Sequence, residues 1–276
     1  MELNDNKTAN AFSNSWNNLP RKSIYTRNQF EEWLAPVNGK DVKNKTVLEL
    51  GCGNASLMYY MAEWSPDFLV GVDLGDSVKS ANDIMRSTKY KKWEIIKKDL
   101  IFYQSEGYDF VYCIGVLHHL KKPIDGFSSV VRNTKSGGFF HCWVYAREGN
   151  SVIVYIVDPI RKISAKFPWW FTKYFVALPL VIPFFLYAKL LKKFQYCKLL
   201  NYFPLFEYSL WIANRNFHFF HHVAFDQLVT PQTCYMKKNT IRKWLTENLE
   251  IDQDSIYIIM RNGNSWKFGG KKLKKD

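Results

Sequence analysis

Between residues 46 and 145 the sequence alternates regularly between short apolar runs and amphipathic stretches, a pattern that few folds can accommodate. Five runs have the length and composition of buried parallel strands: Val47–Leu50, Phe68–Val72, Trp93–Lys97, Phe110–Ile114 and Gly138–Val144. Three of the segments between them each fit one amphipathic helix: Ala55–Trp64, Asp76–Arg86 and Pro123–Asn133. Strand–helix alternation of this kind predicts an α/β, doubly wound, Rossmann-like sheet that binds its ligands at the carboxyl ends of the strands.

The alternation stops after Ala146 and regular patterning returns only near the C-terminus. Residues 239–249 predict a helix in which Asn239 or Thr240 is the N-cap. Ser255–Met260 and Ser265–Phe268 flank an Asn-Gly dipeptide, which predicts a β-hairpin. We therefore expect seven strands in one sheet, with an antiparallel last strand and a large helical, apolar insertion. The expected divisions are an N-terminal lid segment (1–39), a core (40–146), the insertion (147–235), and a C-terminal helix and hairpin that complete the core (236–276).

Composition narrows the class of protein. Hydrophobic residues make up 47% of the chain and charged residues 23%, which excludes a disordered, collagen-like or coiled-coil protein. The net charge of +13 favours an anionic partner: nucleic acid, a phosphorylated substrate or an anionic membrane surface. The five cysteines are scattered and form no C-x-x-C pair, and the polar N-terminus does not resemble a secretory signal, so we expect a cytoplasmic protein.

The segment VLELGCGNA, residues 47–55, is the most informative motif. An apolar strand containing Glu49 is followed by Gly51-Cys52-Gly53 and then by a helix. Glycines at such a turn let a ligand approach the backbone closely, and the helix N-terminus offers unpaired N–H groups. Alone, this pattern is equally typical of a tight strand–helix turn.

Two further carboxylates strengthen the prediction of a nucleotide-like ligand. Asp73, followed by Leu74, ends the second strand about twenty residues after the turn, where such folds bind ribose hydroxyls. Asp99, followed by Leu100, ends the third strand, where it can accept a hydrogen bond from an adenine amino group. An NAD site is the competing interpretation, but its G-x-G-x-x-G fingerprint requires glycine where this chain has Ser56.

With VLELGCGNA, GVDL, KKDL and DFVYCIGVLHHL, the sequence resembles class I S-adenosylmethionine-dependent methyltransferases, especially the broad group typified by quinone-biosynthesis methyltransferases. The resemblance covers residues 45–145 most closely. It implies S-adenosyl-L-methionine as the cofactor, held by Glu49, Gly51, Cys52, Gly53, Asp73, Leu74, Asp99, Leu100, Ile114 and Gly115. Asn54-Ala55 replaces a small residue, commonly glycine, that the family often has after the second glycine.

His118 and His119 follow the fourth strand and are the candidate catalytic residues, with His119 preferred. A neutral imidazole at that place can position a protic acceptor or take its proton. The alternative is a structural role in which the histidines bond the backbone.

Candidate acceptor-binding residues come from two segments. Phe12, Trp16 and Tyr25 resemble the aromatic N-terminal element that family members fold over the cofactor, although ordinary packing onto the sheet explains them equally well. His221 and His222, with His218, have the i, i+3, i+4 spacing of one helical face and are expected to line the acceptor pocket or to pack. No carboxylate or cysteine accompanies them within the run 216–222, and the family that the chain resembles ordinarily needs no metal, so none is expected.

The predicted function is methyl transfer to a small-molecule, lipid-linked or glycan-type acceptor. The alternatives are an RNA methyltransferase, for which the chain has no recognisable binding module, and a non-catalytic protein peripheral to the membrane. The run Phe167–Leu191 is uncharged between Lys173 and Lys189 and contains Pro179 and Pro183. It is predicted either to cap the acceptor pocket or to insert at an anionic membrane interface, and a full transmembrane span is disfavoured.

Overall fold

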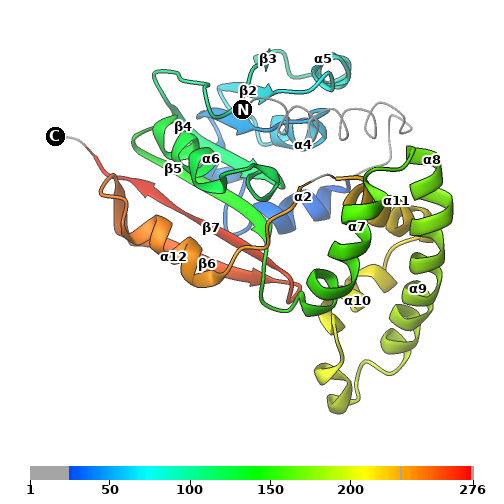
Figure 1. Cartoon of the computed structure of the whole chain (residues 1–276). Helices are drawn as coiled ribbons and strands as arrows, with labels where there is room; N and C mark the ends of the chain where they lie inside the picture. Colours follow the sequence, from blue (N-terminus) through cyan, green and yellow to red (C-terminus); the bar gives the residue numbers. More distant parts are fainter. Residues whose placement is uncertain (1–24, 231, 275–276) are drawn as a thin grey trace.

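The computed structural model describes residues 25–230 and 232–274. Its centre is a seven-stranded sheet in the order β3-β2-β1-β4-β5-β7-β6 (Figure 1). The strands are β1 (Thr46–Leu50), β2 (Phe68–Asp73), β3 (Trp93–Lys97), β4 (Tyr108–Ile114), β5 (Thr134–Tyr145), β6 (Ile251–Arg261) and β7 (Ser265–Lys272). The first five are parallel, and β7 lies antiparallel between β5 and β6. The predicted sheet and its antiparallel hairpin are confirmed.

Helices cover both faces of this sheet. One face carries α2 (Arg27–Leu34), α3 (Gly39–Val42), α4 (Ser56–Glu63) and α5 (Val78–Arg86), and the other carries α6 (Pro123–Arg132) and α12 (Lys238–Thr246). Successive side chains of a strand point to opposite faces, so Val47 packs in one hydrophobic cluster and Leu48 in the other. The result is the three-layer arrangement expected of a doubly wound sheet.

The chain between β5 and α12 forms a helical lobe, which lies beside the sheet (Figure 1). Its elements are η2 (Ile153–Val157), α7 (Asp158–Ser164), α8 (Trp169–Phe171), η3 (Thr172–Ala177), α9 (Leu178–Lys193), η4 (Lys198–Tyr202), α10 (Phe206–Ala213) and α11 (Phe217–Val229). The lobe has two small hydrophobic clusters of its own, formed mainly by α9, α10 and α11 and by α7, η3 and α11. The chain leaves the sheet and returns to it at one place, where Ala146 pairs with Met236.

The start of the last helix differs from the sequence prediction. The N-cap of α12 is Lys237, not Asn239 or Thr240, because the helix begins at Lys238 and both predicted caps lie inside its first turn. Phe12 and Trp16 lie outside the described residues.

Candidate functional site

A cavity of about 280 Å³ opens at the carboxyl ends of β1, β2 and β4, where the strand pattern predicted a ligand site. All ten predicted cofactor-binding residues line it: Glu49, Gly51, Cys52, Gly53, Asp73, Leu74, Asp99, Leu100, Ile114 and Gly115. These residues come from separate strand ends and turns, so the parallel sheet brings them together.

The Gly51–Gly53 turn shapes one wall of the cavity. The backbone N–H groups of Gly51 and Cys52 donate to the carbonyl of Val72 at 2.7 and 3.1 Å, which fixes the turn against the end of β2. Gly53 has a φ of +53°, and a Cβ added there would meet no atom within 4 Å. The glycine therefore faces open space in the cavity, which leaves the backbone accessible to a ligand.

Two carboxylates are held in fixed positions beside this turn. Asp73 accepts hydrogen bonds from the backbone N–H groups of Gly53 at 2.9 Å and Gly75 at 2.8 Å. Asp99 accepts one from the backbone N–H of Ile101 at 2.8 Å. Carboxylates oriented in this way are suited to accept hydrogen bonds from ribose hydroxyls and from an amino group.

Glu49 places a third carboxyl group in the wall of the cavity. Its side chain is buried, and Tyr112 donates a hydrogen bond to it at 2.8 Å. Burial, which disfavours the charged carboxylate, raises the pKa of Glu49 well above its usual value. A cationic ligand beside Glu49 would stabilise the ionised form, so the residue fits the ammonium or sulfonium charge of S-adenosylmethionine.

This arrangement predicts that cofactor affinity increases with pH. The raised pKa favours the protonated carboxyl group of Glu49 in the free protein, whereas a cationic ligand binds better to the carboxylate, so binding should release a proton and strengthen as the pH rises. We expect this trend between about pH 5 and 7, where the α-amino group of the ligand stays charged. Calorimetry with S-adenosylhomocysteine in buffers of different ionisation enthalpy measures both affinity and proton release.

The matched control is Glu49→Gln, which keeps an oxygen for Tyr112 but cannot ionise. Its affinity should be weaker and independent of pH in the same interval. A variant with the same pH dependence as the unmodified protein would contradict the assignment of this effect to Glu49.

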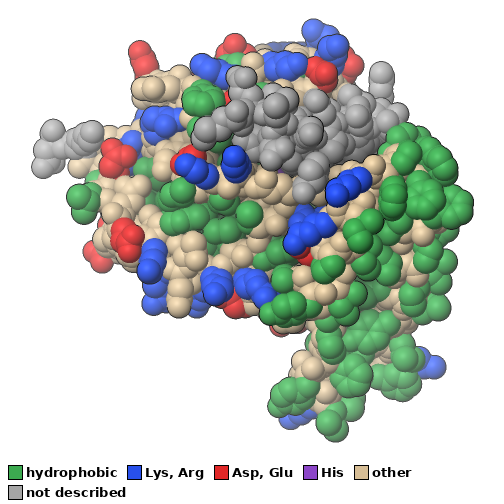
Figure 2. All heavy atoms as spheres, in the orientation of Figure 1, with side chains coloured by type: hydrophobic (Ala, Val, Ile, Leu, Met, Phe, Trp, Pro, Cys, Tyr) green, Lys and Arg blue, Asp and Glu red, His purple; other side chains and the backbone are tan. Residues whose placement is uncertain are grey.

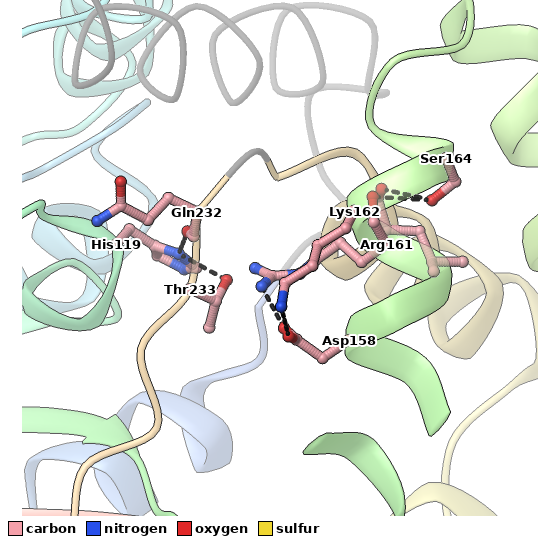
Figure 3. A network of polar contacts seen from close by, with 8 residues as sticks. His119, Asp158, Arg161, Lys162, Ser164, Gln232 and Thr233 are labelled. Carbon is pink, nitrogen blue, oxygen red and sulfur yellow. Dashed lines mark hydrogen bonds and ion pairs between the residues drawn. The ribbon is translucent and has the colours of Figure 1, made fainter. Parts of the chain in front are cut away.

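His119 also lines the cavity, at the end of the short helix η1 (Leu117–His119). Its Nδ1 lies 2.9 Å from the carbonyl of Gln232 and 3.2 Å from the hydroxyl of Thr233 (Figure 3). Because a carbonyl only accepts, the proton belongs on Nδ1 and Nε2 is the hydrogen-bond acceptor. Burial lowers the pKa of His119 to about 4, against the opposing effect of the Gln232 bond, so the imidazole is neutral at pH 7.

His118 differs from its neighbour. It is fully buried and does not line the cavity, and its ring packs against His119, Trp143 and Tyr145. Burial lowers its pKa well below the usual value. Neither ring nitrogen of His118 has a hydrogen-bond partner among the described residues, so His118 packs without bonding the backbone. His119 bonds the backbone carbonyl of Gln232, as the structural alternative expects, and is also the histidine that lines the cavity.

The cavity continues from the strand ends into the helical lobe. Helix α11 contributes Val223, Asp226 and Gln227, its C-cap Thr230 follows them in the wall, and α10 contributes Tyr208 and Trp211. Tyr145, Tyr235 and Arg261 complete this region from the sheet and the returning chain. Sequence reasoning singled out none of these nine residues, although the spacing 223, 226, 227, 230 is the signature of one helical face.

Several buried polar atoms in the cavity wall have no hydrogen-bond partner within residues 25–230 and 232–274. They are the indole N–H groups of Trp33, Trp143 and Trp211 and the side-chain oxygen of Gln29. Buried polar groups are normally paired, so these groups are exceptions. The atoms are themselves buried, however, so the cavity does not expose them to a ligand in this structure.

The predicted acceptor-binding residues are placed differently from one another. Tyr25 lines the cavity. His221 and His222 do not: the Nε2 of His221 lies 2.9 Å from the carbonyl of Lys173, and His222 pairs with Asp226 at 3.1 Å. His222 can therefore influence the cavity only through Asp226, which does line it. No cluster of three or more metal-binding side chains occurs among the described residues.

The segment 167–191 also lies away from the cavity. None of its residues is in the cavity wall, and α9 instead packs against α10 and α11, the helices that form the cap. The expectation that this run itself caps the pocket is therefore wrong. Its aromatic and aliphatic side chains are divided between support of the cap helices and the protein surface.

Comparison with known proteins agrees with this geometry. Residues 48–140 match the family model described as a methyltransferase domain. A curated relative, the tRNA U34 carboxymethyltransferase of Helicobacter acinonychis, is 31% identical over 112 residues, which are 39% of this chain and 43% of that protein. The chain thus spans less than half the length of the curated relatives that it matches.

One solved structure shares the fold over most of the chain. An O-methyltransferase family protein from Burkholderia thailandensis has a TM-score of 0.50 at 11% identity. The match covers 84% of this chain and 52% of that protein's chain. Magnesium protoporphyrin IX methyltransferase from Synechocystis, with S-adenosylhomocysteine bound, has a TM-score of 0.49 at 14% identity and covers 89% and 83%.

Proposed function

We propose that this chain, of which residues 48–140 match a methyltransferase domain, transfers a methyl group from S-adenosylmethionine to a compact, largely apolar acceptor, either a small molecule or a lipid-linked one. One observation carries the proposal: a single cavity is lined both by the predicted cofactor residues and by the cap helices α10 and α11. A volume of about 280 Å³ and walls rich in aromatic side chains suit a small organic ligand.

The predicted cofactor residues divide the binding among the parts of S-adenosylmethionine. Asp73 would hold the ribose hydroxyls, and Asp99 with Leu100 would hold the adenine. The Gly51–Gly53 turn would form the wall beside the methionine portion, with Glu49 beneath the turn, and Ile114 with Gly115 would border the cofactor amino group. When bound, the cofactor supplies an electrophilic methyl group attached to a positively charged sulfur.

The residues of the chain act mainly by positioning. A nucleophilic acceptor atom must meet the methyl carbon in line with the C–S bond that breaks, and correct alignment accounts for most of the rate. His119 is neutral and keeps its proton on Nδ1, so its Nε2 can accept a hydrogen bond from a protic acceptor and orient it. The proton lost from the acceptor passes to this nitrogen and then, because the pKa of His119 is low, to water.

The cap side of the cavity determines the acceptor chemistry. Burial raises the pKa of Tyr25, Tyr145 and Tyr208, which are therefore neutral hydroxyl groups at pH 7. These hydroxyl groups and the aromatic walls favour an acceptor that carries oxygen atoms next to an apolar body. The charge of Arg261 is already paired with Glu32 at 2.8 Å.

Transfer RNA is the second candidate acceptor. The names of the curated relatives and the net charge of +13 favour it. The relatives align only over 112 residues, and the cap helices 206–229 lie outside the family-matched segment, so the family match does not extend to the part of the cavity that we propose selects the acceptor.

Labelled S-adenosylmethionine distinguishes the two candidates. The protein is incubated with the label and either a total lipid and small-molecule extract or bulk tRNA, with His119→Ala as the matched blank. We expect label in the organic-extractable fraction, above the blank, and none in tRNA. Label in tRNA alone would overturn the proposed acceptor in favour of the second candidate.

A further inference from the structure

The helical lobe exposes an unusual amount of apolar surface. Sixteen of the twenty-four exposed large hydrophobic side chains in the described part of the chain lie between Tyr155 and Phe203. Figure 2 shows these hydrophobic side chains gathered over α8, α9 and the end of the lobe, whereas the surface over the sheet mixes charged and apolar groups. An exposed apolar region of this extent indicates a binding surface, because isolated apolar residues are ordinary but large contiguous ones are not.

Helix α9 and the turn η3 before it have two apolar faces. Val181, Ala188 and Leu191 are buried on the side that faces α10 and α11. Phe175, Ile182, Leu186 and Leu190 recur at intervals of seven and four residues on the opposite side, and all are exposed, from 45% to 64%. We call this exposed side, with Trp169 and Trp170 at its start, the outer face.

The charge of the surrounding segment has a single sign. From residue 159 to 206 the sequence contains eight lysine and arginine residues and no aspartate or glutamate. Lys162, Lys166, Lys192, Lys193 and Lys198 are exposed. Surfaces that lie at the boundary between lipid headgroups and acyl chains combine an apolar stripe with neighbouring tryptophan, tyrosine and lysine side chains, as this one does.

We propose that the outer face docks this protein onto an anionic phospholipid bilayer, with its apolar side chains in the interface and the flanking lysines on the headgroups. Charge complementarity selects the bilayer as the occupant, since an uninterrupted cationic segment matches anionic lipid. The inference does not depend on the acceptor proposed above, because a methyltransferase of any soluble substrate can also dock on a membrane.

Docking lies in the plane of the membrane and does not span it. The helical segment Trp169–Lys193 is long and apolar enough to cross a bilayer. Its 18-residue apolar stretch has a mean hydropathy of 1.9, and only 22% of that stretch is buried. Its inner side, however, packs against α10 and α11, which line the cavity. A span would separate α9 from these helices and expose polar residues of the cavity wall to lipid.

Flotation with vesicles tests the proposal on the full chain. Vesicles of phosphatidylcholine alone and of phosphatidylcholine mixed with phosphatidylglycerol are compared at low and high salt. We expect flotation with the mixed vesicles at low salt and about a tenfold lower bound fraction at high salt or without phosphatidylglycerol. Protein that stays at the bottom with the mixed vesicles at low salt overturns the proposal.

Matched variants locate the contact. Leu186→Ser with Leu190→Ser removes apolar side chains from the outer face and should abolish flotation. The control is Phe102→Ser with Leu249→Ser, two side chains that are 71% and 90% exposed over the sheet, and it should float as the unmodified protein does. Equal flotation of the two double variants would overturn the assignment to the outer face.

A second variant guards against misfolding of the first. Lys166→Gln, Lys193→Gln and Lys198→Gln together change exposed lysines around the outer face, and Lys40→Gln, Lys43→Gln and Lys45→Gln change exposed lysines elsewhere. Only the first set should reduce flotation, while both sets keep the affinity for S-adenosylhomocysteine. Sedimentation without lipid adds an independent readout: a dimer that the leucine variant dissociates, with no flotation of the unmodified protein, would identify the face as a protein interface and overturn the proposal.

Discussion

The His119→Ala protein is expected to bind S-adenosylhomocysteine as the unmodified protein does and to transfer methyl groups at least about a hundredfold more slowly. His119 lies in the cavity wall near the cap, and its neutral ring presents Nε2 as the accepting nitrogen. Loss of this nitrogen removes the group that orients the acceptor but leaves Gly51–Gly53 and Asp73 intact. Calorimetry gives the cofactor affinity, and single-turnover methylation of the identified acceptor gives the rate.

His119→Asn separates the chemical role from a structural one. Asparagine can still donate to the carbonyl of Gln232 and hold the returning chain, but it has no counterpart of Nε2. The asparagine variant should therefore be as slow as the alanine variant. Recovery of the rate in His119→Asn would show that His119 acts only by bonding the backbone. At saturating cofactor, kcat should show no His119 transition between pH 5 and 8, because its pKa is about 4.

The sheet was predictable because local and long-range signals agree in it. Each predicted strand is an apolar run that ends at a turn residue, and the hairpin Asn262–Gly263 joins β6 to β7 as its dipeptide indicates. Asp73 ends β2 and Asp99 follows β3 by two residues, and because these two strands are parallel neighbours, both carboxylates lie at the same edge of the sheet. For this reason all ten predicted cofactor residues line one cavity.

The cap was not predictable, because its helices are apolar on most sides. Helices α10 and α11 carry aromatic residues both inward and outward, so periodicity does not reveal which side faces the cavity. Tyr208 and Trp211 reach the cavity only through tertiary packing, and Arg261 reaches it from the far end of β6.

The histidines of α11 illustrate the same limit. Their spacing correctly indicates one helical side, but it does not indicate what that side contacts. His221 meets the carbonyl of Lys173 on η3, and His222 meets Asp226 four residues later on the same helix. The i, i+4 spacing of His222 and Asp226 was visible in the sequence, but it does not indicate that Asp226 lines the cavity and His222 does not.

Asp73→Ala is expected to weaken cofactor binding by about 1–3 kcal/mol, or roughly 5- to 150-fold, which is the cost of leaving polar partners unpaired in a largely desolvated site. The carboxylate of Asp73 has two tasks: it accepts bonds from the N–H groups of Gly53 and Gly75, and it lines the cavity where ribose is predicted. Calorimetric titration with S-adenosylhomocysteine measures the change, and thermal denaturation without ligand measures any loss of stability.

Asp73→Asn distinguishes these two tasks. The amide keeps one accepting oxygen, for which Gly53 and Gly75 compete, and replaces the second acceptor with a donor. If Asp73 serves the cofactor, the asparagine variant should denature at a higher temperature than Asp73→Ala, because it keeps one of the two backbone bonds, and should still bind S-adenosylhomocysteine more weakly than the unmodified protein. Unchanged affinity in a folded Asp73→Asn protein and in a folded Asp73→Ala protein would remove Asp73 from the cofactor site. It would then be only the residue that ties the Gly51–Gly53 turn to the end of β2, and the ribose would have to find its partner elsewhere along the same strand ends.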